Sequence, residues 1–378
     1  MTGILGNRKY RNIALQAAFV GGLALLSVSA VVITRQNIAM QGVTVGWDFL
    51  DYATGWDISF SLVPYSIDDT YARALMVGFV NTVFLGTISV TLAVLLGTVI
   101  GIARLSTHKL VNLLASSYVQ LFRNIPLILQ AFFWYTLVTN LPPARSAIAL
   151  PGRLFISNRG FVMPALNVES VFQLIALVML LAGAVAAAIL SRKLSRLAGG
   201  AMLAAALIVA GCLLAIGKLP DLPMISLPSI NGLRFSGGVV LVPELGAAIM
   251  AISLFGASYI AEIVRAGFLA VPRGLTEAGK ALGLRPMDIL WRIRIPMVIR
   301  IILPTLTNQI IWLMKATTIG IAIGFNDFFG VISTSITHSG QTITLILILI
   351  MGFWLINMTI AFVMNRINSA IALPGYEK

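Results

Sequence analysis

The chain has 378 residues, of which 58% are hydrophobic and only 10% are charged, and its formal net charge is +13. A water-soluble globular domain has about a quarter of its residues charged, so this composition excludes that class and predicts a protein whose solvent is mostly lipid. The single cysteine, Cys212, excludes a disulfide framework and a cysteine metal cluster.

Apolar stretches long enough to cross the hydrocarbon core recur along the chain. A spanning helix needs about twenty mostly apolar residues, because each backbone N–H must find its partner inside the helix. The first stretch lacks a small-residue cleavage pattern, so we expect a retained span and not a cleaved signal peptide. The sequence predicts an all-α, polytopic membrane protein with about eight spans, of which the third and fifth are short: 13–33, 74–103, 125–141, 171–190, 199–216, 245–267, 301–323 and 343–364.

The distribution of lysine and arginine predicts the orientation, because loops rich in positive charge stay in the cytoplasm. With the N-terminus inside, cytoplasmic segments hold eighteen of the 26 basic residues, and Lys315 alone falls within a span. The outer segments hold only Arg35, Arg73, Arg145, Arg153, Arg159, Lys218 and Arg234. An even number of spans returns the C-terminus to the cytoplasm. Membrane insertion therefore explains the basic excess, and no nucleic-acid partner is expected.

The longest cytoplasmic connection between predicted spans, residues 271–296, carries apolar residues at helical spacing. Thr276 is a candidate N-cap, and Glu277 would then lie in the first turn, where a carboxylate suits the helix dipole. Gly283 is typical of a helix end and Pro286 of a helix start. The sequence predicts two short helices outside the bilayer with a bend between them.

These two short helices have an apolar side that includes Ala281, Leu282 and Leu284. Such a side must be buried against something. The pattern alone leaves two interpretations open. The helices lie on the protein's own cytoplasmic ends or on the lipid surface, as amphipathic helices often do, or they dock to a soluble partner.

The same connection resembles the cytoplasmic signature of the permease subunits of ABC importers, which reads Glu-Ala-Ala, three residues, Gly, nine residues, then Ile-x-Leu-Pro. Glu277-Ala278-Gly279, Gly283 and Ile293-Arg294-Ile295-Pro296 keep that spacing, although Gly279 replaces the second Ala and Ile295 replaces Leu. In that family the loop sits in a groove of the ATPase subunit. The resemblance favours docking and implies these ATPase-coupling residues: Thr276, Glu277, Ala278, Gly279, Gly283, Leu284, Arg285 and Pro286.

Other segments resemble the polar amino-acid branch of this family, the histidine-, glutamine- and arginine-like permeases. They are residues 80–82, 97–106, 122–130, 258–262 and 313–318. The resemblance implies that the second, third, sixth, seventh and eighth spans form a five-helix core. The extra N-terminal span and the long insertion before the sixth span are most similar to the general L-amino-acid permeases.

The resemblance also implies a division of the chain into parts. Two parts form the permease core, and the second of them carries the cytoplasmic coupling loop 271–296. The parts are 1–70 with the N-terminal helix and an acidic outer loop, 71–141 and 244–366 as the core, 142–243 as an insertion with two spans, and 367–378 as a cytoplasmic tail.

No catalytic constellation is evident in the sequence, so the chain is not expected to be an enzyme. His108 and His338 lie on opposite sides of the predicted membrane, and neither has a neighbouring cysteine or carboxylate at ligand spacing, so no metal site is expected. No phosphate-binding Gly-x-x-x-x-Gly-Lys-Ser/Thr loop is present. The chain is expected to bind no cofactor, and ATP and Mg²⁺ would be used by partner subunits.

Polar residues in the seventh span are candidates for the translocation path, although interhelical hydrogen bonding would explain them equally well. An ionisable group inside a span is costly and suggests a function, which makes Lys315 the most informative. It could contact a substrate carboxylate, or it could pair with Asp327 if the helix breaks after Gly320 or Gly324; a structural or gating role is favoured. The path candidates are Asn308, Gln309, Lys315, Thr317 and Thr318.

Gly97 and Gly101 have the spacing that lets two helices approach closely, and packing within one subunit is favoured over a dimer contact. Taken together, the resemblance implies an ATP-driven importer of amino acids that works by alternating access in a bacterial inner membrane. Its partners would be a second permease subunit, two cytoplasmic ATPase subunits and a periplasmic binding protein. The alternatives are an importer for another small polar solute, an ion-coupled secondary transporter and a scaffold that transports nothing.

Overall fold

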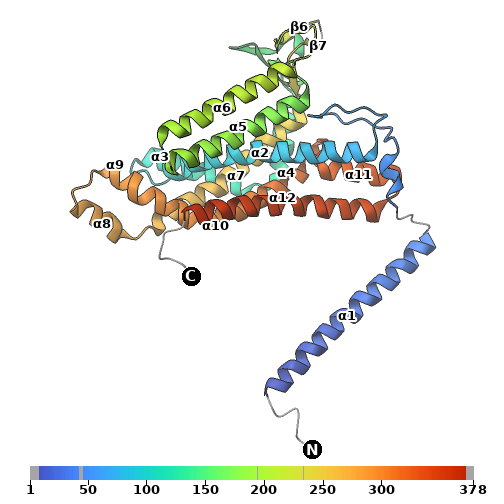
Figure 1. Ribbon diagram of the computed structural model, residues 1–378, viewed down its shortest axis with the longest axis horizontal. Coiled ribbons are helices and arrows are strands. Elements are labelled where there is room, and N and C mark those ends of the chain that lie inside the picture. The colour runs from blue at the N-terminus through green and yellow to red at the C-terminus, as the bar shows by residue number, and fades with distance from the viewer. Residues whose placement is uncertain (1–7, 42–45, 194, 233, 372–378) are drawn as a thin grey trace, which may run out of the picture.

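The computed structural model describes residues 8–41, 46–193, 195–232 and 234–371. Long helices dominate it, which confirms the all-α class (Figure 1). Four of them run side by side along the long axis of the molecule: α2 (Tyr71–Ala103), α7 (Pro243–Ala270), α10 (Ile295–Ala316) and α12 (Thr342–Ile371). α1 (Arg8–Gln41) stands apart from this bundle, and no residue of its most apolar stretch is buried.

Six helices in the described part of the chain are long and apolar enough to cross a membrane. They are Arg11–Ile33, Tyr71–Ala103, Leu197–Ile216, Pro243–Ala270, Pro286–Ile323 and Thr342–Ser369. The predicted stretch 171–190 lies within α5 (Ser170–Lys193), which pairs with α6 (Arg196–Ile216) as an antiparallel hairpin. A count of eight spans remains a prediction.

The predicted stretch 125–141 is occupied by α4 (Leu127–Thr139), which is not a straight span by itself but one half of a bent helix pair. Its 13 residues reach about 20 Å, less than the hydrocarbon thickness of about 30 Å. A helix that the sequence analysis did not predict, α3 (Lys109–Asn124), precedes it at an angle of 103°. Pro126 separates the two because a proline disfavours helical backbone in the residue before it.

The centre of the bundle is the contact between α2 and α7, where glycine allows a close approach. A Cβ atom on Gly97 would lie 2.7 Å from Ile260 Cβ, and one on Gly101 would lie 2.7 Å from the Ala261 carbonyl oxygen. Lipid tails are as apolar as the side chains they surround, so packing between small residues drives helix association in membranes. The predicted packing role of these glycines within one subunit is confirmed.

A second core lies at the end of the bundle where α2 begins. Segment 46–70, with the 3₁₀-turn Asp48–Asp51, folds Phe49 and Ile58 against α2. α11 (Phe328–Ser339), a short helix that the sequence analysis did not predict, packs there through Phe328 and Val331. The acidic segment is therefore an integral part of the bundle.

The insertion contains short strands that the sequence analysis did not predict. An antiparallel sheet has the order β1-β2-β3-β8, formed by Ile148–Leu150, Leu154–Ser157, Gly160–Met163 and Val239–Leu241, after the 3₁₀-turn Ala144–Ser146. Two smaller ladders pair β4 (Ala165–Leu166) with β5 (Ile225–Ser226) and β6 (Ser229–Asn231) with β7 (Arg234–Ser236). Gly246 of α7 lies against Phe161 of β3, which joins the sheet to the bundle.

Candidate functional site

The connection between α7 and α10 is helical almost throughout. α8 (Arg273–Ala281) is followed by a turn, the short α9 (Pro286–Asp288) and a π-helical segment (Ile289–Arg294) that continues into α10. Figure 1 shows α8 and α9 projecting from the end of the bundle opposite to segment 46–70. The predicted first short helix and the bend after it are confirmed, whereas the second helix is not short, because it continues into α10.

The predicted N-cap of the first helix is wrong. α8 starts at Arg273, after Pro272, whose carbonyl accepts a 3.2 Å hydrogen bond from the Leu275 N–H. Thr276 and Glu277 therefore lie inside the helix, and Glu277 is exposed beyond its first turn. The helix begins before Thr276 because Pro272 at its boundary supplies a carbonyl acceptor. A proline has no N–H, so no donor is left unsatisfied at that position.

The end of α8 is set by Gly283, whose φ of +71° is a left-handed conformation that other residues rarely adopt. Its N–H donates to the Lys280 carbonyl at 2.9 Å, and the Leu284 N–H donates to the Gly279 carbonyl at 3.1 Å. These two bonds form a Schellman motif, which satisfies carbonyls that the helix end would leave free. The bend is thus fixed by backbone hydrogen bonds.

The helix restarts at Pro286, which occupies a first-turn position where its missing N–H is not needed. Arg285 before it is extended, and its carbonyl accepts the Ile289 N–H at 3.1 Å. α8 folds back on this second part through Gly279. A Cβ atom there would lie 3.0 Å from Ile293 Cδ1 and 3.1 Å from Ile289 Cγ1, so glycine in place of the family's alanine allows a closer approach.

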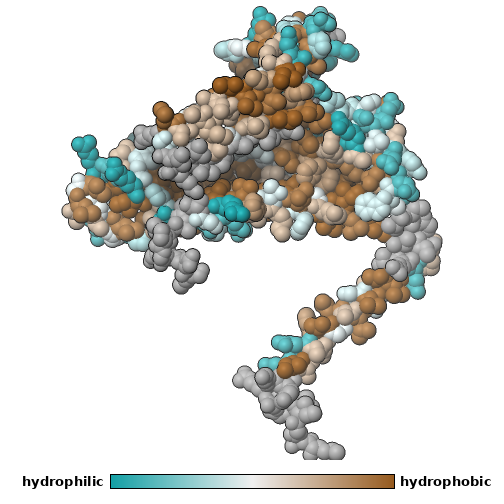
Figure 2. Space-filling model, viewed as in Figure 1, coloured by the Kyte–Doolittle hydropathy of each residue, from teal (hydrophilic) through white to brown (hydrophobic). Residues whose placement is uncertain are grey.

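The apolar side of this connection remains open to solvent in the described chain. Leu282 is 80% exposed, Met287 63% and Trp291 62%, and Ala281 is exposed as well. Figure 2 shows apolar and polar surface mixed at this end of the molecule. Of the two interpretations that the sequence left open, burial against the protein's own helix ends is wrong for these side chains, whereas Leu284 is partly buried. The exposed side chains are free to contact a partner or lipid.

The candidate path residues of α10 do not form one cluster. Asn308 and Lys315 are exposed and lie seven residues apart, on the same face of the helix, whereas Gln309 is partly buried. Thr317 and Thr318 lie in the 3₁₀-helix Thr317–Ile323, where their hydroxyls donate to the carbonyls of Met314 and Lys315, both at 2.9 Å. The two threonines therefore bond to their own helix and not to neighbouring helices.

The alternative in which Lys315 pairs with Asp327 is wrong. The helix does break, because Gly324 has a φ of +83°, but the buried Asp327 carboxylate caps α11 by accepting the Gly330 N–H at 2.9 Å. The ion pairs among the described residues do not include Lys315. Its ammonium group lies on the exposed face of α10.

Asn81 and Thr82 of α2 organise the opposite end of the bundle, a role that the sequence analysis did not assign. The Asn81 amide donates to the carbonyls of Phe60 at 2.7 Å and Asn326 at 3.0 Å. The Thr82 hydroxyl accepts the Phe328 N–H at 2.9 Å. Two adjacent polar residues inside an apolar span are the sequence signal for such a network, since buried polar groups need partners.

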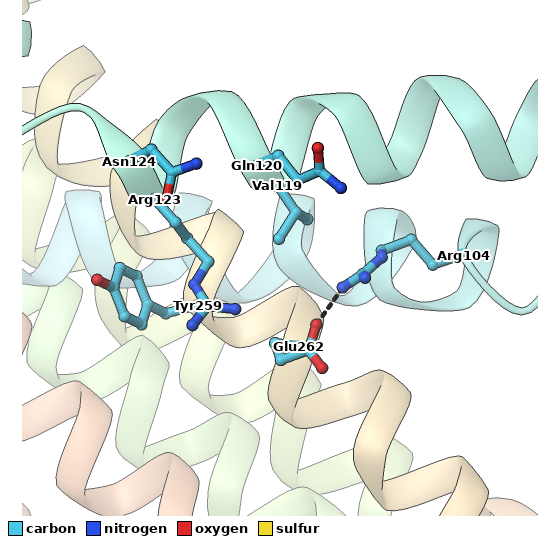
Figure 3. A pocket seen from close by; sticks show the side chains of 7 residues that line it. All are labelled: Arg104, Val119, Gln120, Arg123, Asn124, Tyr259 and Glu262. Atoms are coloured by element: carbon cyan, nitrogen blue, oxygen red, sulfur yellow. Dashed lines mark hydrogen bonds and ion pairs between the residues drawn. The ribbon is translucent and has the colours of Figure 1, made fainter.

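A cavity of about 440 Å³ opens between α3, α7 and the end of α2 (Figure 3). Glu262 accepts hydrogen bonds from Arg104 and from Arg265 one turn along α7, so α2 and α7 are joined by an ion-pair network. The Arg123 guanidinium lies 5.0 Å from the centre of the Tyr259 ring, in cation–π geometry. The lining residues are Arg104, Val119, Gln120, Arg123, Asn124, Tyr259 and Glu262.

The long apolar helices and the bent, outward-facing connection define a polytopic membrane protein of the permease class. The chain belongs to the family described as the binding-protein-dependent transport system inner membrane component, whose model matches residues 90–372. This family membership confirms the resemblance found in the connection 271–296.

Two relatives share about a third of their residues with this chain over most of its length. It is 34% identical to the putative amino-acid ABC transporter permease protein YhdX of Escherichia coli (strain K12), over 98% of both chains. It is 35% identical to the general L-amino acid transport system permease protein AapQ of Rhizobium johnstonii, over 90% of this chain and 87% of that protein.

A more distant relative is the glutamate/glutamine/aspartate/asparagine transport system permease protein BztB of Rhodobacter capsulatus. The identity is 29%, over 98% of this chain and 96% of that protein. The prediction that this chain is an amino-acid ABC importer permease is confirmed.

Proposed function

We propose that this permease takes up amino acids by alternating access, driven by two cytoplasmic ATPase subunits that dock on α8 and α9. The observation that carries the proposal is the 80% exposure of Leu282, at the tip of a bend that backbone hydrogen bonds hold in place. An exposed apolar side chain next to a fixed turn suits a partner groove, because little ordering entropy remains to be lost on binding.

The coupling residues have distinct roles in this proposal. Gly283 fixes the bend, Pro286 starts the second helix, and Leu284 and Arg285 between them lie nearest the ATPase surface. Thr276, Glu277, Ala278 and Gly279 form the helix that carries this tip. ATP and Mg²⁺ would be bound by the ATPase subunits. The α8 end of the molecule would then face the cytoplasm, together with both termini, and segment 46–70 would face the periplasm and its binding protein.

A second permease subunit would cover the exposed face of α10. Lys315 is costly to leave against lipid, and a water-filled path between two permease subunits would keep its charge solvated. Asn308 on the same face would line that path, with Gln309 beside it, whereas Thr317 and Thr318 would shape the helix end. The five core helices of 71–141 and 244–366 would form the moving unit, and 1–70, 142–243 and the tail 367–378 would be additions to it.

Transport in sealed membrane vesicles tests this proposal. Uptake of L-glutamine and L-glutamate by the complete complex is expected to require ATP and binding protein. Leu282→Asp is expected to abolish co-purification of the ATPase subunits and to lower uptake at least tenfold, because a carboxylate cannot enter an apolar groove without losing its water. Leu197→Asp is the matched control, since Leu197 is 86% exposed at the start of α6.

Two outcomes would contradict the proposal. Uptake that continues without ATP and follows an ion gradient would identify a secondary transporter. If Leu282→Asp binds the ATPase subunits normally, this face of the loop does not belong to the coupling interface. Uptake of another small polar solute in place of amino acids would keep the coupling mechanism and change the substrate.

A further inference from the structure

The cavity between α3 and α7 has an excess of positive charge. Glu262 is matched by two arginines, Arg104 and Arg265, while Arg123 at the other side of the cavity has no ion pair among the described residues. Three cations and one carboxylate leave the site positive. A small anion entering it would therefore gain electrostatic energy in a partly enclosed place, where water screens charges less than in bulk solvent.

Two amide side chains line the cavity together with Arg123. Gln120 and Asn124 lie four residues apart on α3, so they occupy one face of that helix, and both line the cavity with Arg123 (Figure 3). Each amide offers a carbonyl oxygen as acceptor and an NH₂ group as donor. The site can thus bind an anion and an ammonium group close to each other.

The position of Arg123 is fixed by an aromatic stack. Its guanidinium lies over the Tyr259 ring, and that ring in turn lies 5.0 Å from Phe255 and 6.5 Å from Trp312, measured between ring centres. A planar guanidinium held in this way presents its N–H groups in a fork that matches a carboxylate. The 440 Å³ cavity is within the usual size range of small-ligand sites.

We infer that this cavity is a binding site for a free α-amino acid, with the carboxylate on Arg123 and the ammonium group on the Gln120 and Asn124 carbonyl oxygens. The inference rests on the proposed function for the identity of the ligand and on the proposed orientation for its place near the cytoplasmic face. Arg104 and Glu262 hold α2 and α7 together as the wall of the site. An amino acid would occupy it after crossing the membrane or when present at high concentration inside the cell.

Equilibrium binding of radiolabelled L-glutamine and L-glutamate to the complete complex tests the inference, in nanodiscs of phosphatidylcholine without ATP or binding protein. Arg123→Gln is expected to weaken binding at least tenfold, the effect of losing one charge-assisted pair. Arg123→Lys keeps the charge but loses the planar fork, so its binding should lie between those of the wild type and Arg123→Gln. Arg153→Gln is the control, because Arg153 is an exposed arginine of the insertion, outside the cavity.

Glutaminamide, in which an amide replaces the α-carboxylate, should compete poorly with L-glutamine. The inference is overturned if Arg123→Gln binds like the wild type, if glutaminamide competes equally, or if the wild type shows no saturable binding. Displacement of the amino acid by phosphatidylglycerol added to the nanodiscs would identify a lipid phosphate as the occupant and overturn it as well. Uptake by the wild type is measured in parallel to separate the two proposals. If the wild type takes up amino acids and Arg123→Gln binds them as tightly as the wild type does, only this binding site is rejected.

Discussion

The contact between α2 and α7 and the connection from α8 to α10 are both positioned by glycine, but for opposite reasons. Gly97 and Gly101 are buried and leave room for a neighbouring helix, whereas Gly283 has nothing within 4 Å of its would-be Cβ and is needed for its backbone conformation alone. The first region is held by contacts inside the chain. The second is held by its own backbone hydrogen bonds and keeps an exposed apolar side, which is consistent with the docking proposed above.

The largest loss of stability is expected for a bulky side chain at Gly97, which should disrupt the contact between α2 and α7. Gly97→Leu places a branched side chain where even a Cβ would lie 2.8 Å from the Ala257 carbonyl oxygen, and we expect a loss of about 3 kcal/mol or failure to accumulate in the membrane. Thermal unfolding in detergent measures it. Gly211→Leu on α6, where nothing lies within 4 Å, serves as the control. Equal melting temperatures for the two variants would contradict the packing role.

Gly283→Val should have an intermediate effect that is local to the second region. A β-branched residue at a φ of +71° is strained by about 1–2 kcal/mol, so the Schellman turn should open and ATPase binding should fall. Gly283→Asn should retain function because asparagine tolerates this conformation. Gly274→Val is a matched control at a helical glycine with open space. Intact uptake by Gly283→Val would show that the bend is not needed for coupling.

The smallest effect is expected for the ion pair between Arg292 and Asp288. The two side chains are 3.4 Å apart and 75% and 38% exposed, so Arg292→Ala should change stability by less than about 0.5 kcal/mol, and less still at high salt. A double-mutant cycle with Asp288→Ala measures the pair. A coupling above about 1 kcal/mol would mean that this part of the connection is more enclosed than its exposure indicates.

The sequence correctly predicted the long helices and the helix ends that depend on residues close together in the chain. Apolar length predicted α2, α7, α10 and α12, and Gly283 and Pro286 predicted the two helix boundaries because backbone freedom and a missing N–H are properties of single residues. The predicted stretch 125–141 matches α4, but the sequence analysis missed its partner α3 because α3 mixes polar and apolar residues and has no long apolar run. The strands of the insertion have two to four residues, too few to show an alternating pattern.

The rest of the candidate site could not be predicted because its members are distant in the sequence. Arg104 and Glu262 are 158 residues apart, and Asn81 reaches Asn326 across 245 residues. Each of these residues has several partners of suitable chemistry in the chain, and only the packing of α2 against α7 and α11 selects one. The pattern of α8 alone left burial and docking open, since an apolar side exposed in the chain has the same spacing as one buried within it.

The helix that follows the bend has a mechanical consequence. It runs without a sharp break from Pro286 to Ile323, and its 38 residues extend about 57 Å, nearly twice the hydrocarbon thickness of about 30 Å. In the orientation proposed above, the Pro286 end of this helix would lie on the cytoplasmic side, so that a partner bound at the bend would act directly on a helix that enters the bilayer.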